Sequence, residues 1–125
     1  MMRREHAERN EMLCSELLSG GKYHDWAVTT AFYSALHFVQ FKMFEMKGGS
    51  MPFTTLEEAK AHYRCHSLHR VRQSLIADHF PEVMADYAFL EKNSKTARYL
   101  NYTTSLGRAK QAKQRLGNIK KHCCP

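Results

Sequence analysis

The chain has 125 residues, of which 43% are hydrophobic and 25% are charged, and its formal net charge is +7. This length suits one domain with its own core and is too short for two, so we treat residues 1–125 as a single domain. No stretch is apolar for long enough to cross a bilayer, and the opening MMRREHAERNE lacks the apolar core of a secretory signal. We therefore expect a cytoplasmic protein that does not contact membranes.

The residue pattern predicts helices throughout. No run alternates apolar and polar residues over five or more positions with β-branched enrichment, which would indicate a strand. The first helix is predicted from about Arg3 to Ser19. The pair Gly20-Gly21 ends it, because glycine takes the left-handed conformation after a helix at no steric cost.

The stretch from Asp25 to Met46 is the predicted centre of the fold. As a helix it carries two apolar stripes side by side, one through Phe32 and the other through Trp26. A surface helix needs only one apolar face, so two faces predict neighbours on both sides and a buried Trp26 ring. Asp25 is the expected cap at its start, and Gly48-Gly49 is the expected end.

Cap signals then divide the chain into further helices. Thr54 with Glu57, or Thr55 with Glu58, can form a capping box, so a short helix should begin near Leu56. Residues 56–80 have a helical pattern with a break in the middle.

Two more helices are predicted after this region. Pro81 suits the first turn of a helix that ends near Tyr99. Its expected buried positions are Val83, Tyr87, Leu90, Ser94 and Ala97. Ser105 can cap a last helix, and residues 119–125 are expected to be a disordered end. Short connections favour antiparallel neighbours, so the sequence predicts an all-α, up-and-down bundle of four long helices plus a short one.

The positive charge is concentrated near the C-terminus. Through Glu91 there are ten Lys/Arg against twelve Asp/Glu, whereas from Lys92 onward there are nine Lys/Arg and no acid. An acid-free basic segment is a common feature of nucleic-acid contacts. The alternative is a solvated helix face that is merely basic.

Arginines from separate predicted helices could converge on a phosphate, since the planar guanidinium matches phosphate geometry. Tyrosines beside them offer stacking faces for unpaired bases. The alternative is surface salt bridges to Asp78, Glu82 or Asp86. The predicted nucleic-acid-binding residues are Arg70, Arg98, Tyr99, Tyr102 and Arg108, with Arg72 as a further candidate phosphate ligand.

Histidines and cysteines give two other hypotheses. In one continuous helix His62, Cys65, His66 and His69 would stack on one side, and such side chains can ligate zinc or a similar metal. His37, inside the central stretch, is either a proton carrier in a cleft or a core residue bonded to a neighbouring helix. The four cysteines match no disulfide framework and are expected to be free thiols.

Five segments follow one another between residues 22 and 102: DWAV at 25–28, AFYSALH at 31–37, HxxR at 69–72, YxxL at 87–90 and SKTARY at 94–99. In this order they resemble small prokaryotic proteins of the HEPN superfamily. The resemblance implies an up-and-down helical bundle that forms a homodimer. It also implies a toxin–antitoxin or defence setting and, as a possible partner, a nucleotidyltransferase protein.

Active HEPN members are metal-independent endoribonucleases with an Arg-x4-6-His motif, two copies of which meet across the dimer. In that chemistry the arginine stabilises charge developing on the phosphate, and the histidine moves a proton of the attacking 2′-hydroxyl or of the leaving oxygen. The spacing occurs here in Arg64 with His69, in Arg72 with His79 and in Arg115 with His122, and the residues of the first two pairs are the candidate catalytic residues. The residue after each arginine, however, is not the Asn, Asp or His most common in active members.

We therefore expect a non-catalytic, dimeric HEPN-like module that binds RNA, a nucleotide or a partner protein and needs no cofactor. One alternative is a metal-independent ribonuclease. The other is a helical metal-binding protein that uses the His/Cys set.

Overall fold

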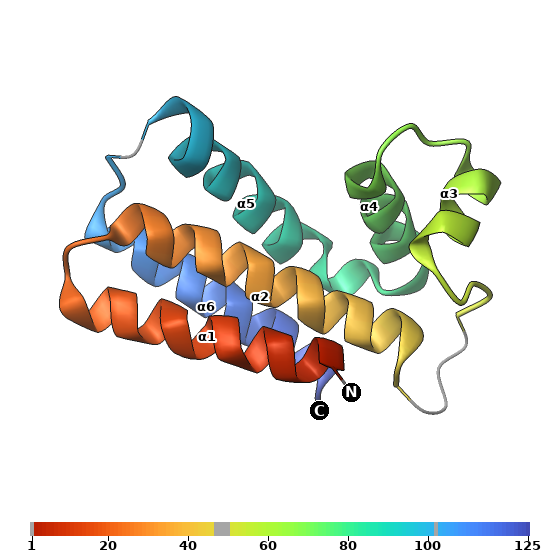
Figure 1. Cartoon of the computed structure of the whole chain (residues 1–125), viewed down its shortest axis with the longest axis horizontal. Coiled ribbons are helices and arrows are strands. Elements are labelled where there is room, and N and C mark those ends of the chain that lie inside the picture. The colour runs from red at the N-terminus through yellow and green to blue at the C-terminus, as the bar shows by residue number, and fades with distance from the viewer. Residues whose placement is uncertain (1, 47–50, 102) are drawn as a thin grey trace.

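The computed structural model describes residues 2–46, 51–101 and 103–125, and every regular element within these ranges is a helix. Four segments form the bundle (Figure 1): α1 (Met2–Gly20), α2 (His24–Phe44), α5 (Met84–Lys95) with its π-helical extension η2 (Thr96–Leu100), and α6 (Leu106–Cys123). Two shorter helices, α3 (Leu56–Tyr63) and α4 (Leu68–His79), pack together beside it, and the 3-10 turn η1 (Pro81–Val83) leads from α4 into α5. The predicted all-α bundle is confirmed.

Helix α2 is the centre of the bundle, in contact with α1, α5 and α6. Its first predicted stripe is buried, with Phe32 and Val39 both fully inaccessible. The second stripe is only partly covered, since Trp26 is 54% exposed and Tyr33 is 37% exposed. The predicted burial of Trp26 is therefore wrong, because α1 and α5 flank α2 and α6 lies behind it, which leaves one edge of α2 open (Figure 1).

The end of α1 is where the sequence predicts it, whereas the predicted cap of α2 is wrong. Gly21 adopts φ 70 after α1, the left-handed conformation that glycine favours. Helix α2 begins one residue before Asp25, so Asp25 is not the cap; it lies in the first turn, where a negative charge favours the helix dipole. The helix ends at Phe44, and the predicted stop at Gly48-Gly49 lies outside the described residues.

The predicted break within residues 56–80 lies between α3 and α4. Thr55 caps α3, since its hydroxyl accepts a hydrogen bond from the Glu58 backbone N–H at 3.1 Å, as one of the two predicted capping boxes requires. Arg64 then adopts φ 55 and ψ 36, the left-handed conformation, which ends α3. Ser67 caps α4 through the Arg70 backbone N–H at 3.3 Å. The break therefore gives two short helices in place of one.

The C-terminal half matches its predicted pattern except at its end. The expected buried positions of the α5 region, from Val83 to Ala97, are all buried. Ser105 caps α6 by accepting from the Arg108 backbone N–H at 3.1 Å. The disordered end expected over residues 119–125 is wrong for its first five residues, because Ile119 and Cys123 extend the buried stripe of α6 and both are fully inaccessible.

None of the four cysteines is joined in a disulfide. No helix in the described ranges combines the length and the apolar character that crossing a bilayer requires.

Candidate functional site

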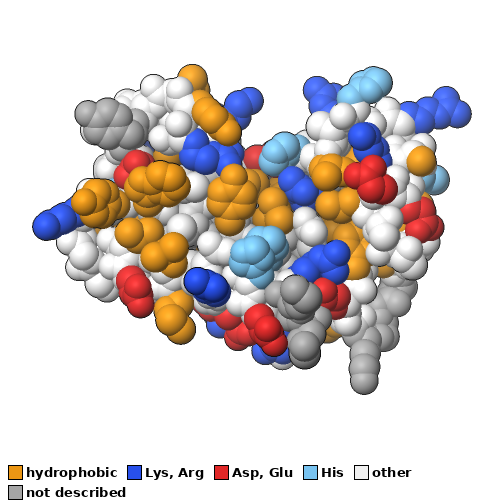
Figure 2. All heavy atoms as spheres, in the orientation of Figure 1, with side chains coloured by type: hydrophobic (Ala, Val, Ile, Leu, Met, Phe, Trp, Pro, Cys, Tyr) orange, Lys and Arg blue, Asp and Glu red, His pale blue; other side chains and the backbone are white. Residues whose placement is uncertain are grey.

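A groove of about 700 Å³ separates α4 from the α5–η2 segment, and Tyr33 of α2 also lines it. Figure 2 shows a hollow between the α3–α4 pair and the far end of α5, with Lys/Arg and His side chains around it. The groove lining includes three permanent cations, Arg70, Lys95 and Arg98, and one carboxylate, Glu91. Its net charge is therefore positive, which favours an anionic ligand.

Arg98 lies between two tyrosine rings in this groove. Its guanidinium carbon is 5.3 Å from the centroid of the Tyr33 ring and 5.2 Å from that of the Tyr99 ring, and its Nη1 donates a hydrogen bond to the Tyr33 hydroxyl. The π-helical turn η2 carries both Arg98 and Tyr99, and single π turns recur at functional sites in helices. The rings therefore hold a planar donor group beside exposed aromatic surface.

Arg70 approaches the groove from the opposite wall. It is exposed in the first turn of α4, and no hydrogen bond or ion pair of its side chain is made with any residue that the structure describes. Ser67, the cap of α4, also lines the groove, so the positive end of the helix dipole adds to the cationic charge there.

Arg72 is not open to the groove but buried, with 7% exposure. Its Nε donates to the Tyr87 hydroxyl at 3.2 Å and its Nη1 to Gln40 Oε1 at 3.5 Å. Its Nη2 lies 3.0 Å from His69 Nδ1, which must accept because a guanidinium only donates. Arg72 therefore joins α4 to α2 and α5. Burial raises the pKa of Tyr87 to about 12, so its hydroxyl stays protonated.

The two candidate catalytic pairs are not assembled within one chain. Arg64 is exposed in the connection between α3 and α4, and His79 is exposed at the far end of α4 from the groove. Across residues 2–46, 51–101 and 103–125, neither Arg64 with His69 nor Arg72 with His79 forms a hydrogen bond. His69 instead meets Arg72, one turn away on α4.

The predicted nucleic-acid-binding residues divide into two groups. Arg70, Arg98 and Tyr99 meet in the groove. Arg108 lies elsewhere: its Nη1 donates to Asn93 Oδ1 at 3.0 Å, and it lines a separate hollow of about 290 Å³ at the start of α6. Tyr102 lies outside the described residues.

Part of the basic segment is neutralised by ion pairs. Arg115 Nη1 lies 3.1 Å from Asp86 Oδ1, and Lys120 Nζ lies 2.9 Å from Glu11 Oε1. These two ion pairs occupy cations of α6, whereas Lys95 and Arg98 from the start of the segment contribute to the groove. Lys95 and Tyr33 belong to segments that carry the HEPN resemblance, but neither was predicted as a binding residue, and the stripe of Tyr33 was assigned to the core.

The predicted stack of His62, Cys65, His66 and His69 does not form. The left-handed residue Arg64 ends α3 before Cys65, so the four side chains do not share one helix. His62 packs against the Phe53 ring with centroids 5.1 Å apart, whereas Cys65 and His69 line the groove. In the part of the chain that the structure describes, no three His, Cys, Asp or Glu side chains gather as a metal ion requires.

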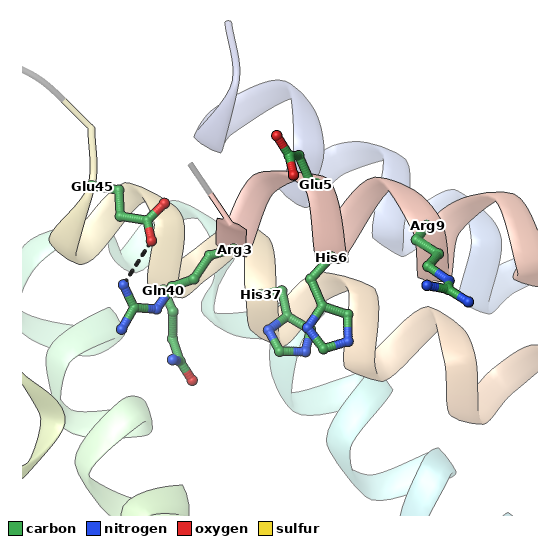
Figure 3. Close-up of a pocket in the computed structure, with 7 residues that line it drawn as sticks. All are labelled: Arg3, Glu5, His6, Arg9, His37, Gln40 and Glu45. Carbon is green, nitrogen blue, oxygen red and sulfur yellow. Dashed lines mark hydrogen bonds and ion pairs between the residues drawn. The ribbon is translucent and has the colours of Figure 1, made fainter.

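A second hollow of about 750 Å³, which we call the histidine hollow, lies between α1 and α2 (Figure 3). The rings of His6 and His37 stack in it with centroids 3.9 Å apart and planes 21° apart. Burial, and then the charges of His6, Arg3 and Arg72, lower the pKa of His37 to about 4, so its ring is neutral near pH 7. The hollow is lined by Arg3, Glu5, His6, Arg9, His37, Gln40 and Glu45.

Comparison of the chain with protein-family models, with curated proteins and with solved structures finds no significant match. The HEPN resemblance therefore depends on the residues that carry it.

Proposed function

We propose that the chain is a non-catalytic binding module whose groove holds a phosphate and an adjoining base, supplied by RNA or by a nucleotide. The observation that carries this proposal is the position of Arg98 between Tyr33 and Tyr99, opposite Arg70. A guanidinium can grip a phosphate with two parallel hydrogen bonds. Tyr99 is 73% exposed, so its ring is open to stack on a base.

The binding role is favoured over catalysis by the state of the arginines. A ribonuclease of the HEPN kind needs an arginine and a histidine side by side at an open surface. Arg72, which contacts His69, is buried and bonded to Tyr87 and Gln40, so its donors are already engaged. With the HEPN resemblance, we extend the proposal to a homodimer in a toxin–antitoxin or defence setting, with a nucleotidyltransferase as a candidate partner.

Fluorescence anisotropy with a labelled single-stranded RNA tests the groove. Binding should weaken steeply between about 50 and 200 mM salt, because bound phosphates release counterions. Arg70→Ala should weaken binding and reduce the slope of log affinity against log salt by about 1. Arg98→Lys should weaken binding without reducing that slope, because the charge stays and the planar fork is lost.

Lys121→Ala is the matched control, since Lys121 is exposed on α6 and lines neither the groove nor the histidine hollow. It should bind like the wild type. Equal losses in Lys121→Ala and Arg70→Ala, or a flat salt titration, would show that the groove is not the binding site.

A further inference from the structure

We infer that the ligand is single-stranded RNA several nucleotides long, which runs from the groove across the open edge of α2 into the histidine hollow. The inference rests on the proposed function, since it extends the same site. It adds a second contact region, and with it a preference for a chain of nucleotides over a single one.

The two hollows adjoin on one side of α2. Tyr33 lines the groove and His37 lines the histidine hollow, and residues four apart on a helix are neighbours on one face. Gln40, also in the histidine hollow, accepts from Arg72 at 3.5 Å, and the same guanidinium contacts His69 of the groove at 3.0 Å. The buried Arg72 guanidinium therefore bridges a lining residue of each hollow.

The histidine hollow offers a base-stacking surface. The exposed ring of His6 lies flat on His37, which is uncharged near neutral pH, and histidine is among the side chains on which unpaired bases stack. Figure 3 shows the two rings, one from α1 and one from α2, lying against each other.

The hollow also offers a cation for a phosphate. Arg3 is occupied by Glu45, whose Oε1 accepts from its Nη1 at 2.9 Å. Arg9 is exposed, and its side chain forms no hydrogen bond or ion pair among the described residues. Figure 3 shows Arg9 on α1, one turn beyond His6. An aromatic ring with an arginine nearby is also found in the groove, where Arg98 lies beside Tyr99.

Two stacking surfaces on one face of the protein favour a single-stranded ligand over a duplex or a mononucleotide. A duplex hides its base faces, and a mononucleotide occupies only one surface at a time. A flexible single strand can place one base on Tyr99 and another on His6, with its phosphates near the arginines beside each ring. Figure 2 shows Lys/Arg and His side chains interspersed with hydrophobic ones across this face, over α2.

Competition binding with a length series tests the inference. The probes are a nucleoside monophosphate, a dinucleotide, single strands of four and eight nucleotides, and an eight-base-pair RNA duplex. Affinity should rise with single-strand length, and the duplex should compete less well than the eight-nucleotide strand. His6→Ala should weaken binding of the eight-nucleotide strand about tenfold, a loss within the range for one base–aromatic stack, and should weaken monophosphate binding much less, because the monophosphate can still bind in the groove.

Arg9→Ala should give the same selective loss, and Arg4→Ala is its matched control. Both variants remove one positive charge from the same helix. Arg4 is exposed and lines neither hollow, so its loss should not affect binding. If the monophosphate binds as tightly as the longest strand, or if the two arginine variants behave alike, the extended path is wrong while the groove stands. If no probe binds, the inference and the proposed function both fail.

Discussion

The Nε of Arg72 donates a hydrogen bond to the hydroxyl of Tyr87 across 3.2 Å, and both side chains are buried. This bond joins α4, one wall of the groove, to α5, which carries the other. Arg72→Ala should lower the free energy of unfolding by about 3 kcal/mol, because it leaves buried partners unsatisfied. Urea denaturation measures the change. Arg70→Ala, on the same helix but exposed, should stay within about 0.5 kcal/mol of the wild type, and a similarly small effect for Arg72→Ala would refute its structural role.

Truncating a side chain in the buried apolar stripe of α2 should cost much more folding stability than truncating one in the exposed stripe. Phe32 is fully inaccessible and packs against the Tyr87 ring with centroids 5.8 Å apart, so Phe32→Ala should cost about 3–5 kcal/mol by transfer and cavity terms. Trp26 is 54% exposed, so Trp26→Ala should cost under about 1 kcal/mol. Thermal melts of both variants check this. Equal decreases in stability for the two variants would mean that the Trp26 side chain is covered in solution.

His37 should make stability depend on pH. Its pKa is about 4 when folded, below the ordinary value of 6.5, so between these pH values the unfolded chain binds more protons than the folded chain. Stability is therefore lost as the pH falls from 6.5 toward 4 and levels off below that. We expect a contribution of about 1–2 kcal/mol, since partial exposure screens the full shift.

Urea midpoints at about pH 7 and pH 4.5 measure this dependence, because the two values bracket most of the window over which the unfolded chain takes up the proton. His37→Gln should show a smaller difference between the two pH values than the wild type. His66→Gln, an exposed histidine of the α3–α4 connection, should keep the wild-type difference. Identical pH dependence in all three proteins would remove His37 as the cause.

RNA should remain intact when incubated with the protein in EDTA. The expected reason is that Arg64 and His69 are not bonded within the described chain, and that Arg72 is bonded to Tyr87. Gel analysis of end-labelled RNA reads out cleavage. Cutting that is abolished by Arg64→Ala, with folding retained, would instead establish the metal-independent ribonuclease.

Local patterns made the helices predictable. The spacing of Val83, Tyr87 and Leu90 marks one face of a helix. The hydroxyls of Thr55 and Ser105 cap helices by accepting hydrogen bonds from backbone N–H groups three residues later, so the cap is visible in the local sequence. The left-handed turn at Arg64 carried no such signal, because that conformation is unusual outside glycine, and this turn is what separates Cys65 from His62.

The site was less predictable because it depends on tertiary packing. Arg70 and Arg72 have the same side chain two positions apart, and Arg72 is the one buried, where it bonds Tyr87 of α5 and Gln40 of α2. Likewise, whether Trp26 and Tyr33 are core or surface depends on which sides of α2 the other helices cover. His6 gave no signal at all, since its partner His37 belongs to another helix.

The docking of α3 and α4 has a dynamic consequence. Among the described helices, α3 packs only against α4, to which it is also tied by the hydrogen bond from the Tyr63 hydroxyl to Asp78. Helices with so few partners open at lower free energy than the bundle. Amide exchange should therefore be faster over residues 56–79 than in α2. The α4 wall of the groove should thus open more readily than the wall formed by the bundle.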